Sequence, residues 1–318
     1  MTAAVRSAPK LPDRNAVRAT EAVIRSHVRR TPVVDALPED FGLHGAPLNF
    51  KLEFMQHSGT FKARGAFANL LLRKGADRGV VAASGGNHGA AVAYAAMKLG
   101  IKAHIYVPRI SSQAKINRIM QYGAEITVGG DTYADAYAAS HTFAKEHGLI
   151  EVHAYDGYET LCGQGMVGLE WLEQSPGIDT LLVAVGGGGL IGGIAAAAEG
   201  KVRIIGVEPE NAATLYEATR AGHPVDVPVS GVAADSLGAR RIGELCFGLS
   251  GYIDRTVLVT DEAITAAQKK IWDVLRVVVE PGGAAAMAAL LTGRYVPAGD
   301  EKVGVLLCGA NTTAVKFD

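Results

Sequence analysis

Short apolar segments alternate along this chain with longer segments of helical character. The segments LLVAV (181–185) and VGVLLC (303–308) are continuously apolar, as strands buried on both faces of a parallel sheet are. Stretches such as 163–174 and 261–275 lie among such segments and have the length and composition of helices. This β-α alternation predicts an α/β fold in which crossover helices connect mostly parallel strands.

The length of 318 residues suggests two domains, because a typical domain has roughly 100–200 residues. The alternating segments form two series that would share one cleft. We expect a smaller α/β domain over residues 53–149 and a larger domain that combines residues 1–52 with 150–318. Residues 222–255 mix proline, glycine and serine with apolar residues, which predicts a long ordered loop that lines a site.

Charge and composition exclude several classes of protein. The formal net charge is −1 and the charges are well mixed, so no basic stripe indicates a nucleic-acid partner. No run of about 18 apolar residues predicts a membrane span. The three cysteines, Cys162, Cys246 and Cys308, lack the spacing of a zinc site or a disulfide framework. The N-terminus also lacks the apolar core of a signal peptide, so we expect a cytoplasmic protein.

The first loop that can carry chemistry is SGTFKARG (58–65). It places Lys62 in the first turn of a predicted helix, for which Ser58 is a plausible cap. The first turn carries the positive end of the helix dipole, which disfavours the ammonium form of a lysine. A free amine is what a lysine needs to form a Schiff base. The alternative is a solvated surface lysine.

The second loop is ASGGNHG (83–89), between a predicted strand and a predicted helix. Gly85 and Gly86 let backbone amides turn toward an anion at the helix N-terminus. Asn87 and His88 add polar side chains at the same place. The alternative is a tight turn in which Asn87 caps the helix.

The third loop is VGGGGLIGG (185–193), whose four consecutive glycines suit a phosphate cradle. It also matches the dinucleotide fingerprint, as Gly187-x-Gly189-x-x-Gly192, with Glu208 near the place of the ribose-binding acid. A NAD-binding protein is therefore an alternative, but it explains this loop alone. Two anion cradles and an activated lysine together indicate a ligand with a phosphate and a carboxylate, as pyridoxal phosphate (PLP) bound to an amino acid has.

The motifs resemble those of the fold-type II PLP family of serine/threonine dehydratases and serine racemases. The similar segments follow in the family's order over nearly the whole chain: RTPVVD, HSGTFKARGA, ASGGNHG, GGGGLIGG, VEPE, EPGGAAAMAAL and LLCGANTT. The resemblance implies a tryptophan synthase β-like architecture with PLP between two α/β domains, of which the larger binds the cofactor. It also implies a homodimer.

The resemblance assigns roles to particular residues. Lys62 would bind PLP as a Schiff base and later act as general base. The other cofactor-binding residues would be Asn87 at the phenolic oxygen, the amides of Gly186, Gly187, Gly188 and Gly189 at the phosphate, and Cys308 beside the pyridine nitrogen. The substrate carboxylate would bind at Ser84, Gly85, Gly86 and His88. A neutral thiol at the pyridine nitrogen makes the ring a weaker electron sink, which favours quick β-elimination. Without the resemblance, Cys308 would be interpreted as an inert core residue.

The implied activity is a PLP-dependent ammonia-lyase that converts L-threonine or L-serine to a 2-oxo acid and ammonia. Three alternatives differ in substrate or reaction: a dehydratase of hydroxyaspartate or another hydroxylated amino acid, a β-replacement enzyme of the cysteine-synthase type, and a nucleotide-binding sensor without activity. Arg240 and Arg241 would pair with the second carboxylate of hydroxyaspartate, or would be solvated surface charges.

Two positions depart from the family pattern. Racemases carry a serine at the place of Gly85, so we expect dehydration without efficient racemisation. Glu208 and Ala212 match two ligands of a divalent cation that some members bind, but the third position falls on Thr214, a poor ligand for a hard cation. The alternative for Glu208 is to cap the next helix. Glu280, before PGGAAAM, is expected near the cofactor.

Overall fold

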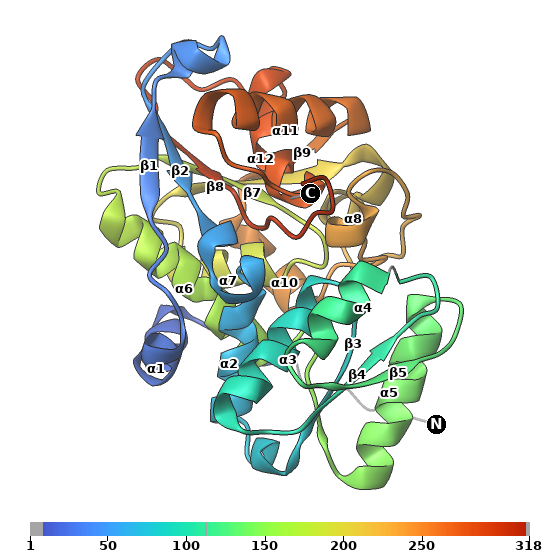
Figure 1. Cartoon of the computed structure of the whole chain (residues 1–318). Helices are drawn as coiled ribbons and strands as arrows, with labels where there is room; N and C mark the ends of the chain where they lie inside the picture. The colour runs from blue at the N-terminus through green and yellow to red at the C-terminus, as the bar shows by residue number, and fades with distance from the viewer. Residues whose placement is uncertain (1–8, 112, 316–318) are drawn as a thin grey trace.

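The computed structural model describes residues 9–111 and 113–315, and its strands form two sheets (Figure 1). The larger sheet has the spatial order β1 (Val33–Ala36), β2 (Leu48–Lys51), β10 (Val303–Leu306), β7 (Thr180–Ala184), β8 (Arg203–Pro209) and β9 (Arg255–Val259). The smaller sheet has the order β5 (Glu125–Val128), β4 (Ala103–Val107), β3 (Val80–Ala83) and β6 (Ile150–Glu151). Every pairing is parallel except that of β1 with β2, which confirms the predicted α/β class.

The continuously apolar segments are the central strands. Every residue of β3, β7 and β10 is buried, because helices cover both faces of each sheet. Two strands are shorter than predicted. The strand expected over 48–54 ends at Lys51, two residues before a 3-10 turn over Glu53–Met55, and the strand expected over 149–153 consists of Ile150–Glu151 alone.

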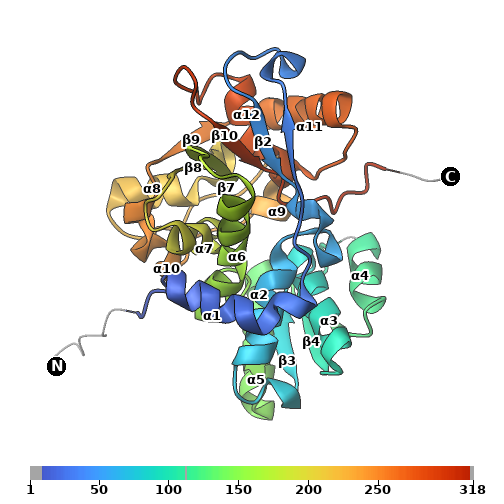
Figure 2. The same cartoon turned by 90° about the vertical axis from the view of Figure 1, so that its left-hand side faces the viewer.

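The helices around the smaller sheet are α2 (Lys62–Leu72), α3 (Asn87–Leu99), α4 (Gln113–Met120) and α5 (Tyr133–His147). Those around the larger sheet are α6 (Tyr158–Gln174), α7 (Gly189–Ala198), α8 (Thr214–Ala221), α11 (Asp261–Leu275) and α12 (Pro281–Leu291). In Figure 1, α11 and α12 lie together above the larger sheet, whereas α6 and α7 lie below it, toward the smaller sheet. In Figure 2, α1 (Arg14–Ile24) lies along one side of the molecule, where it contacts α2 and α6.

Several helix boundaries correct the predictions. Ser58 does not cap α2: it lies in a 3-10 turn with φ of 59°, and the N-cap of α2 is Phe61. Helix α6 begins at Tyr158, five residues before the expected start. The expected loop over 222–255 is ordered but contains two short helices, α9 (Ala234–Leu237) and α10 (Glu244–Gly248).

The two sheets correspond to two series of alternating elements, and strand β6 lies at the border between them. Residues Ile150–Glu151 pair with β3 of the smaller sheet. The domain limits at 52/53 and 149/150 stay a prediction, and residues 1–8 and 316–318 of the expected larger domain lie outside the described residues. Within the described residues, no helix has both the length and the apolar character that a membrane span needs.

Candidate active site

The three predicted loops meet in one cleft at the carboxyl ends of parallel strands, where α/β proteins bind ligands. The second loop connects β3 to α3, the third connects β7 to α7, and the first leads into α2, which begins at Lys62. The open space in this cleft is small, with room of about 40 Å³ for the centres of water molecules. It is lined by Phe61, Lys62, Asn87, Tyr155, Ala184, Gly186, Gly187, Gly188, Gly189, Leu190, Ile191, Ser236, Leu237, Glu280 and Cys308. All seven residues proposed to bind the cofactor are therefore together.

Lys62 is the only lysine or arginine among the described residues that line this cleft. Its Nζ donates a hydrogen bond to the carbonyl of Ala154 at 2.7 Å. Burial lowers the pKa of Lys62 from 10.5 to about 8, although Cys308 and Glu280 oppose the change. The sequence predicted a favoured free amine from the helix dipole, and the structure adds desolvation as the main cause.

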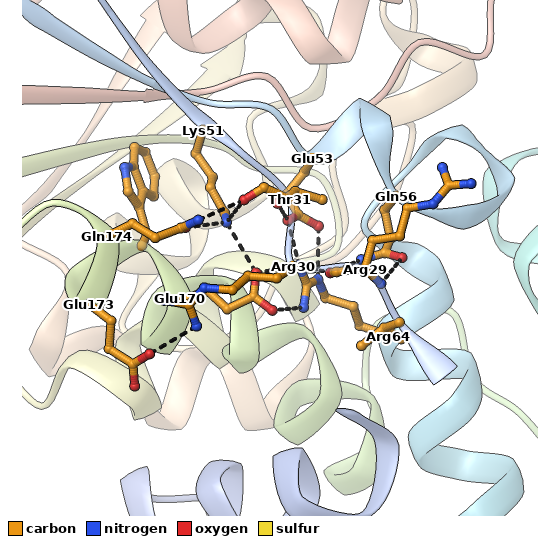
Figure 3. Close-up of polar contacts among 12 residues, drawn as sticks. Arg29, Arg30, Thr31, Lys51, Glu53, Gln56, Arg64, Glu170, Glu173 and Gln174 are labelled. Atoms are coloured by element: carbon orange, nitrogen blue, oxygen red, sulfur yellow. Dashed lines mark hydrogen bonds and ion pairs between the residues drawn. The ribbon is translucent and has the colours of Figure 1, made fainter. Parts of the chain in front are cut away.

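A network of buried charges holds the helix that carries Lys62 (Figure 3). Arg64 donates to Glu53 at 2.9 and 2.7 Å and to Glu170 at 2.8 Å through two nitrogens, and Lys51 contacts Glu170 at 3.1 Å. All four side chains are fully buried. Burial alone would raise the pKa of Glu170, but the Arg64 guanidinium lowers it to about 2. The network joins α2 to the end of β2 and to α6. Its member on α2, Arg64, is two residues from Lys62.

Asn87 is held from both sides of its amide. Its Nδ2 donates to Glu280 at 2.7 Å, and its Oδ1 accepts from Asn311 at 2.6 Å. Asn311 also donates to the carbonyl of Ser58 at 2.9 Å and accepts from Arg118. Because these bonds use the side chain of Asn87, it does not cap α3. Sequence analysis assigned no role to Asn311, although this residue belongs to the CGANTT segment that resembles the family.

Glu280 lies where the sequence placed it, at the cofactor cleft. It is the N-cap of α12 and is 5% exposed. Burial raises its pKa to about 7, while the hydrogen bond from Asn87 opposes the rise. Carboxyl groups whose pKa is raised this far above the ordinary value cluster at functional sites.

Two helix N-termini in the loops lack side-chain caps. Gly86 is the N-cap of α3, and Gly188, with φ of +88°, is the N-cap of α7. First-turn amides without such caps are available to anions. The glycines of the third loop are required by space, since a Cβ on Gly187 would lie 2.2 Å from the ring of Tyr155. A Cβ on Gly189 would lie 2.8 Å from Oε1 of Gln164, a buried atom without a hydrogen-bond partner.

The other predicted residues of the second loop have different surroundings. The His88 side chain is buried and faces the carbonyl of Val152 at 2.8 Å, and burial lowers its pKa to about 3. Ser84 Oγ accepts from the Gly86 amide at 3.1 Å. A Cβ on Gly85 would lie 2.1 Å from the hydroxyl of Ser111. Any contact of these residues with substrate stays a prediction. Because the His88 side chain is buried against Val152, such a contact at His88 would be made by its backbone amide.

Cys308 is buried, and its Sγ lies 3.4 Å from the carbonyl of Gly282. Burial raises the pKa of this thiol, so it is neutral at physiological pH. This neutral state is the one on which the prediction of a weak electron sink depended.

Glu208 caps helix α8. Its Oε1 accepts from Thr214 Oγ1 at 2.9 Å and from the Leu215 amide at 2.8 Å, and its Oε2 accepts from the Tyr216 amide at 2.8 Å. No cluster of three carboxylate, histidine or cysteine side chains suited to a metal occurs within residues 9–111 and 113–315. A cation held by Glu208 and Ala212 stays a prediction, and capping is the role that the geometry supports.

The fold and the cleft define the class: an α/β enzyme with one desolvated lysine and two helix N-termini that lack side-chain caps. A family model described as "Pyridoxal-phosphate dependent enzyme" matches residues 24–309. A phenylserine dehydratase from Ralstonia pickettii is 40% identical over 96% of this chain and 95% of its own length. An L-threonine ammonia-lyase from Geobacter sulfurreducens is 36% identical over 90% and 72% of the two chains. The structure of maize serine racemase has a TM-score of 0.90 and 34% identity, and covers 96% of this chain and 95% of its own.

The chain belongs to the family of pyridoxal-phosphate-dependent enzymes, and the predicted resemblance to its fold-type II members is confirmed. The NAD-binding alternative is wrong, because the family match spans all three loops and the carboxylate of Glu208 is occupied with helix α8. The nucleotide-sensor alternative fails for the same reason.

Proposed function

We propose that this protein is a PLP-dependent ammonia-lyase that converts a β-hydroxy amino acid to a 2-oxo acid and ammonia. The observation that carries the proposal is the cleft itself, in which a lysine of lowered pKa lies with two uncapped helix N-termini. A phenylserine dehydratase and an L-threonine ammonia-lyase, both reported above, are similar over most of this chain.

The residues present fit PLP. The amides at Gly186 to Gly189 and the start of α7 would hold its phosphate, where a side chain on Gly187 or Gly189 would not fit. Asn87 would face its phenolic oxygen, because Asn311 and Glu280 fix the orientation of the amide. Cys308 would lie beside the pyridine nitrogen as a neutral thiol. When bound, PLP supplies the electron sink for the substrate's Cα.

The chain's own residues supply binding and proton transfer. The amine of Lys62 would hold the cofactor, and the same amine, when free, would take the proton from the substrate's Cα. The amides at the N-terminus of α3 hold the substrate carboxylate. The β-hydroxyl would leave as water with a proton equivalent to the one that Lys62 removes from Cα. The enamine product would tautomerise to an imine, which water hydrolyses to the 2-oxo acid and ammonia.

The glycine at position 85 is the basis for expecting dehydration without efficient racemisation. A racemase needs a second acid/base on the opposite face of Cα, and glycine cannot supply one. The hydroxyl of Ser111 fills the space that a side chain at position 85 would need. We expect formation of D-serine from L-serine to be far slower than formation of 2-oxo acid, as chiral chromatography of the same reaction would measure. Comparable rates would contradict this part of the proposal.

Dicarboxylic substrates are not favoured. Arg240 and Arg241 are exposed, and Arg241 pairs with Asp226 and Glu244 outside the cleft, each at 3.5 Å. No second cation among the described cleft residues would hold the side-chain carboxylate of hydroxyaspartate. The lining next to the proposed cofactor site is instead apolar or aromatic, from Phe61, Tyr155 and Leu237.

Two finer expectations remain part of the proposal. A homodimer is implied by resemblance to the family, and size-exclusion chromatography with light scattering would test it. A cytoplasmic location is supported by the three cysteines, which are all free and buried in the structure.

The deciding experiment is an absorption spectrum of the purified protein with PLP, for the natural chain and for Lys62→Ala. We expect a visible band that is lost or shifted in the variant, together with a fall in 2-oxo acid formation of at least about 10³-fold. Lys98→Ala, which changes an exposed lysine on α3, is the control and should change neither. A natural chain that stays colourless with added PLP would overturn the proposal.

A further inference from the structure

A series of side-chain hydrogen bonds leads from helix α4 to the cleft. Arg118 donates through its Nη1 to Oδ1 of Asn311, and Asn311 donates through its Nδ2 to Oδ1 of Asn87 at 2.6 Å. Asn87 in turn donates through its Nδ2 to Oε1 of Glu280 at 2.7 Å. The last two residues line the cleft, and the first two connect them to α4. We call these four residues the hydrogen-bond series.

The direction of each amide in the series is set by its partners. A guanidinium has hydrogen-bond donors only, so the oxygen of Asn311 must face Arg118. The carbonyl of Ser58 accepts from Nδ2 of Asn311 at 2.9 Å and cannot donate, which favours the same direction. Nδ2 of Asn311 therefore faces the oxygen of Asn87, and Nδ2 of Asn87 faces Glu280 and the cleft. An amide nitrogen carries two hydrogens, so one is left for an acceptor in the cleft after Glu280 has taken the other.

Asn311 also lies against the turn that leads to Lys62. Thr60 and Gly309 form an antiparallel bridge, so the segment of Asn311 runs beside this turn. A Cβ on Gly59 would lie 2.5 Å from Oδ1 of Asn311, which shows how closely the two segments pack. The place of Asn311 is therefore fixed relative to the residue that would hold the cofactor.

Helix α4, which carries Arg118, has a second contact near the cleft. Lys115, one turn earlier on α4, pairs with Asp235 of α9 at 2.8 Å. The next two residues of α9, Ser236 and Leu237, line the cleft. Because two contacts attach α4 to segments at the cleft, the guanidinium of Arg118 has a defined position there.

We propose that Asn311 is a positioning residue for the cofactor, and that Arg118 sets the direction of its amide so that Asn87 presents an N–H group to the phenolic oxygen of PLP. The inference rests on the proposed function, which places Asn87 at that oxygen. A hydrogen bond donated to the phenolic oxygen favours the ionised form of that oxygen. An ionised phenol absorbs at longer wavelength than a neutral one, so the visible band of the holoenzyme reports the direction of the Asn87 amide.

The first test is Asn311→Asp, which keeps the shape of the side chain but removes its N–H groups. One carboxylate oxygen keeps the contact with Arg118, whereas the other repels the oxygen of Asn87 and turns that amide around. At saturating PLP, we expect the visible band to lose intensity to a band at shorter wavelength. The dissociation constant of PLP should rise by at least about tenfold. Asn117→Asp makes the same change at an exposed asparagine of α4 and is the matched control.

The second test changes Arg118 and leaves Asn311 in place. Arg118→Met removes the donor but not the carbonyl of Ser58, so we expect a change in the same direction and a rise in the dissociation constant of about threefold. Arg118→Lys keeps a group that only donates and should stay within about twofold of the natural chain. Arg109→Met, which changes an exposed arginine paired with Asp131, is the control.

A double substitution shows whether Asn311 acts through Asn87. Asn87→Ala alone should shift the band in the same direction, and adding Asn311→Asp should then change it little further. An equal effect of Asn311→Asp with and without Asn87 would overturn the inference, because Asn311 would then act by another route. An unchanged band in Asn311→Asp would also overturn it and leave the proposed function intact. A natural chain that shows no visible band with PLP would refute the proposed function instead.

Discussion

Two buried polar regions lie at opposite ends of the first turn of α2. They differ in whether their ionisable side chains have oppositely charged partners. Around Arg64, four fully buried side chains carry two positive and two negative charges in mutual contact; Glu170 is held at a pKa of about 2, although burial still lowers the pKa of Lys51. Around Lys62, burial acts on groups without such partners. It lowers the pKa of Lys62 to about 8 and raises that of Glu280 to about 7.

The difference shows that burial by itself does not decide the state of an ionisable group. A buried charge survives where an opposite charge and hydrogen bonds replace water, and it tends to neutralise where they do not. The paired region is suited to hold α2 in place. The unpaired region is suited to proton transfer near neutral pH, since its groups change charge there.

The largest expected effect comes from breaking the paired region. Glu170→Gln removes one charge from the network and leaves Arg64 and Lys51 with a single buried carboxylate between them. We expect the free energy of unfolding to fall by about 3–5 kcal/mol, because an uncompensated buried charge remains. Urea denaturation followed by circular dichroism would measure the loss.

The control for that variant is Glu173→Gln, on the same helix. Glu173 contacts Arg30 at 3.0 Å, but both side chains are more than 40% exposed, at 41% and 46% (Figure 3). A solvated pair of this kind contributes at most about 1 kcal/mol. If the two variants lose equal stability, burial does not distinguish the pairs and the comparison fails.

A smaller effect is expected from the unpaired region, and it depends on pH. The folded-state pKa of Glu280, about 7, lies above its ordinary 4.5, so this group's contribution to stability is present below pH 4.5 and is lost as the pH rises to 7. Glu280→Gln cannot ionise. In the PLP-free protein, we expect the variant to gain up to about 3 kcal/mol over the natural chain between pH 4.5 and pH 8.

Denaturant unfolding at several pH values would measure this gain. Because Glu208 titrates in the same range in both proteins, its effect cancels in the difference. A constant difference between the two proteins across this pH range would show that Glu280 remains ionised in the folded state.

The smallest effect concerns the rate at which the PLP-free protein takes up its cofactor. Only the free amine of Lys62 attacks the aldehyde of PLP, so the uptake rate should rise with pH and level off above a midpoint near 8. Between pH 6 and 7 the rise should be about tenfold. Stopped-flow absorbance would measure it. A rate that still rises near pH 10 would indicate a lysine with its ordinary pKa of 10.5.

The sequence by itself determined the α/β class, the two series of strands and helices, and the loops that carry Lys62, Asn87 and Gly186–Gly189. These features are local: each depends on an apolar strand, a few glycines and the start of a helix within about ten residues. The same locality explains why the sequence indicated Lys62 in a first turn but misplaced the cap of α2, which depends on the strained turn at Ser58.

Only the tertiary structure decided what surrounds those loops. Asn87 contacts Glu280 and Asn311 across 193 and 224 residues of sequence, and the ring of Tyr137 on α5 packs against that of His153. In the tertiary structure, Glu208 also caps α8, and Arg240 and Arg241 are exposed to solvent. Burial and pairing arise from the packing of distant segments, and they set the charge of each group, so no local pattern could have given the pKa of Lys62 or of Glu280.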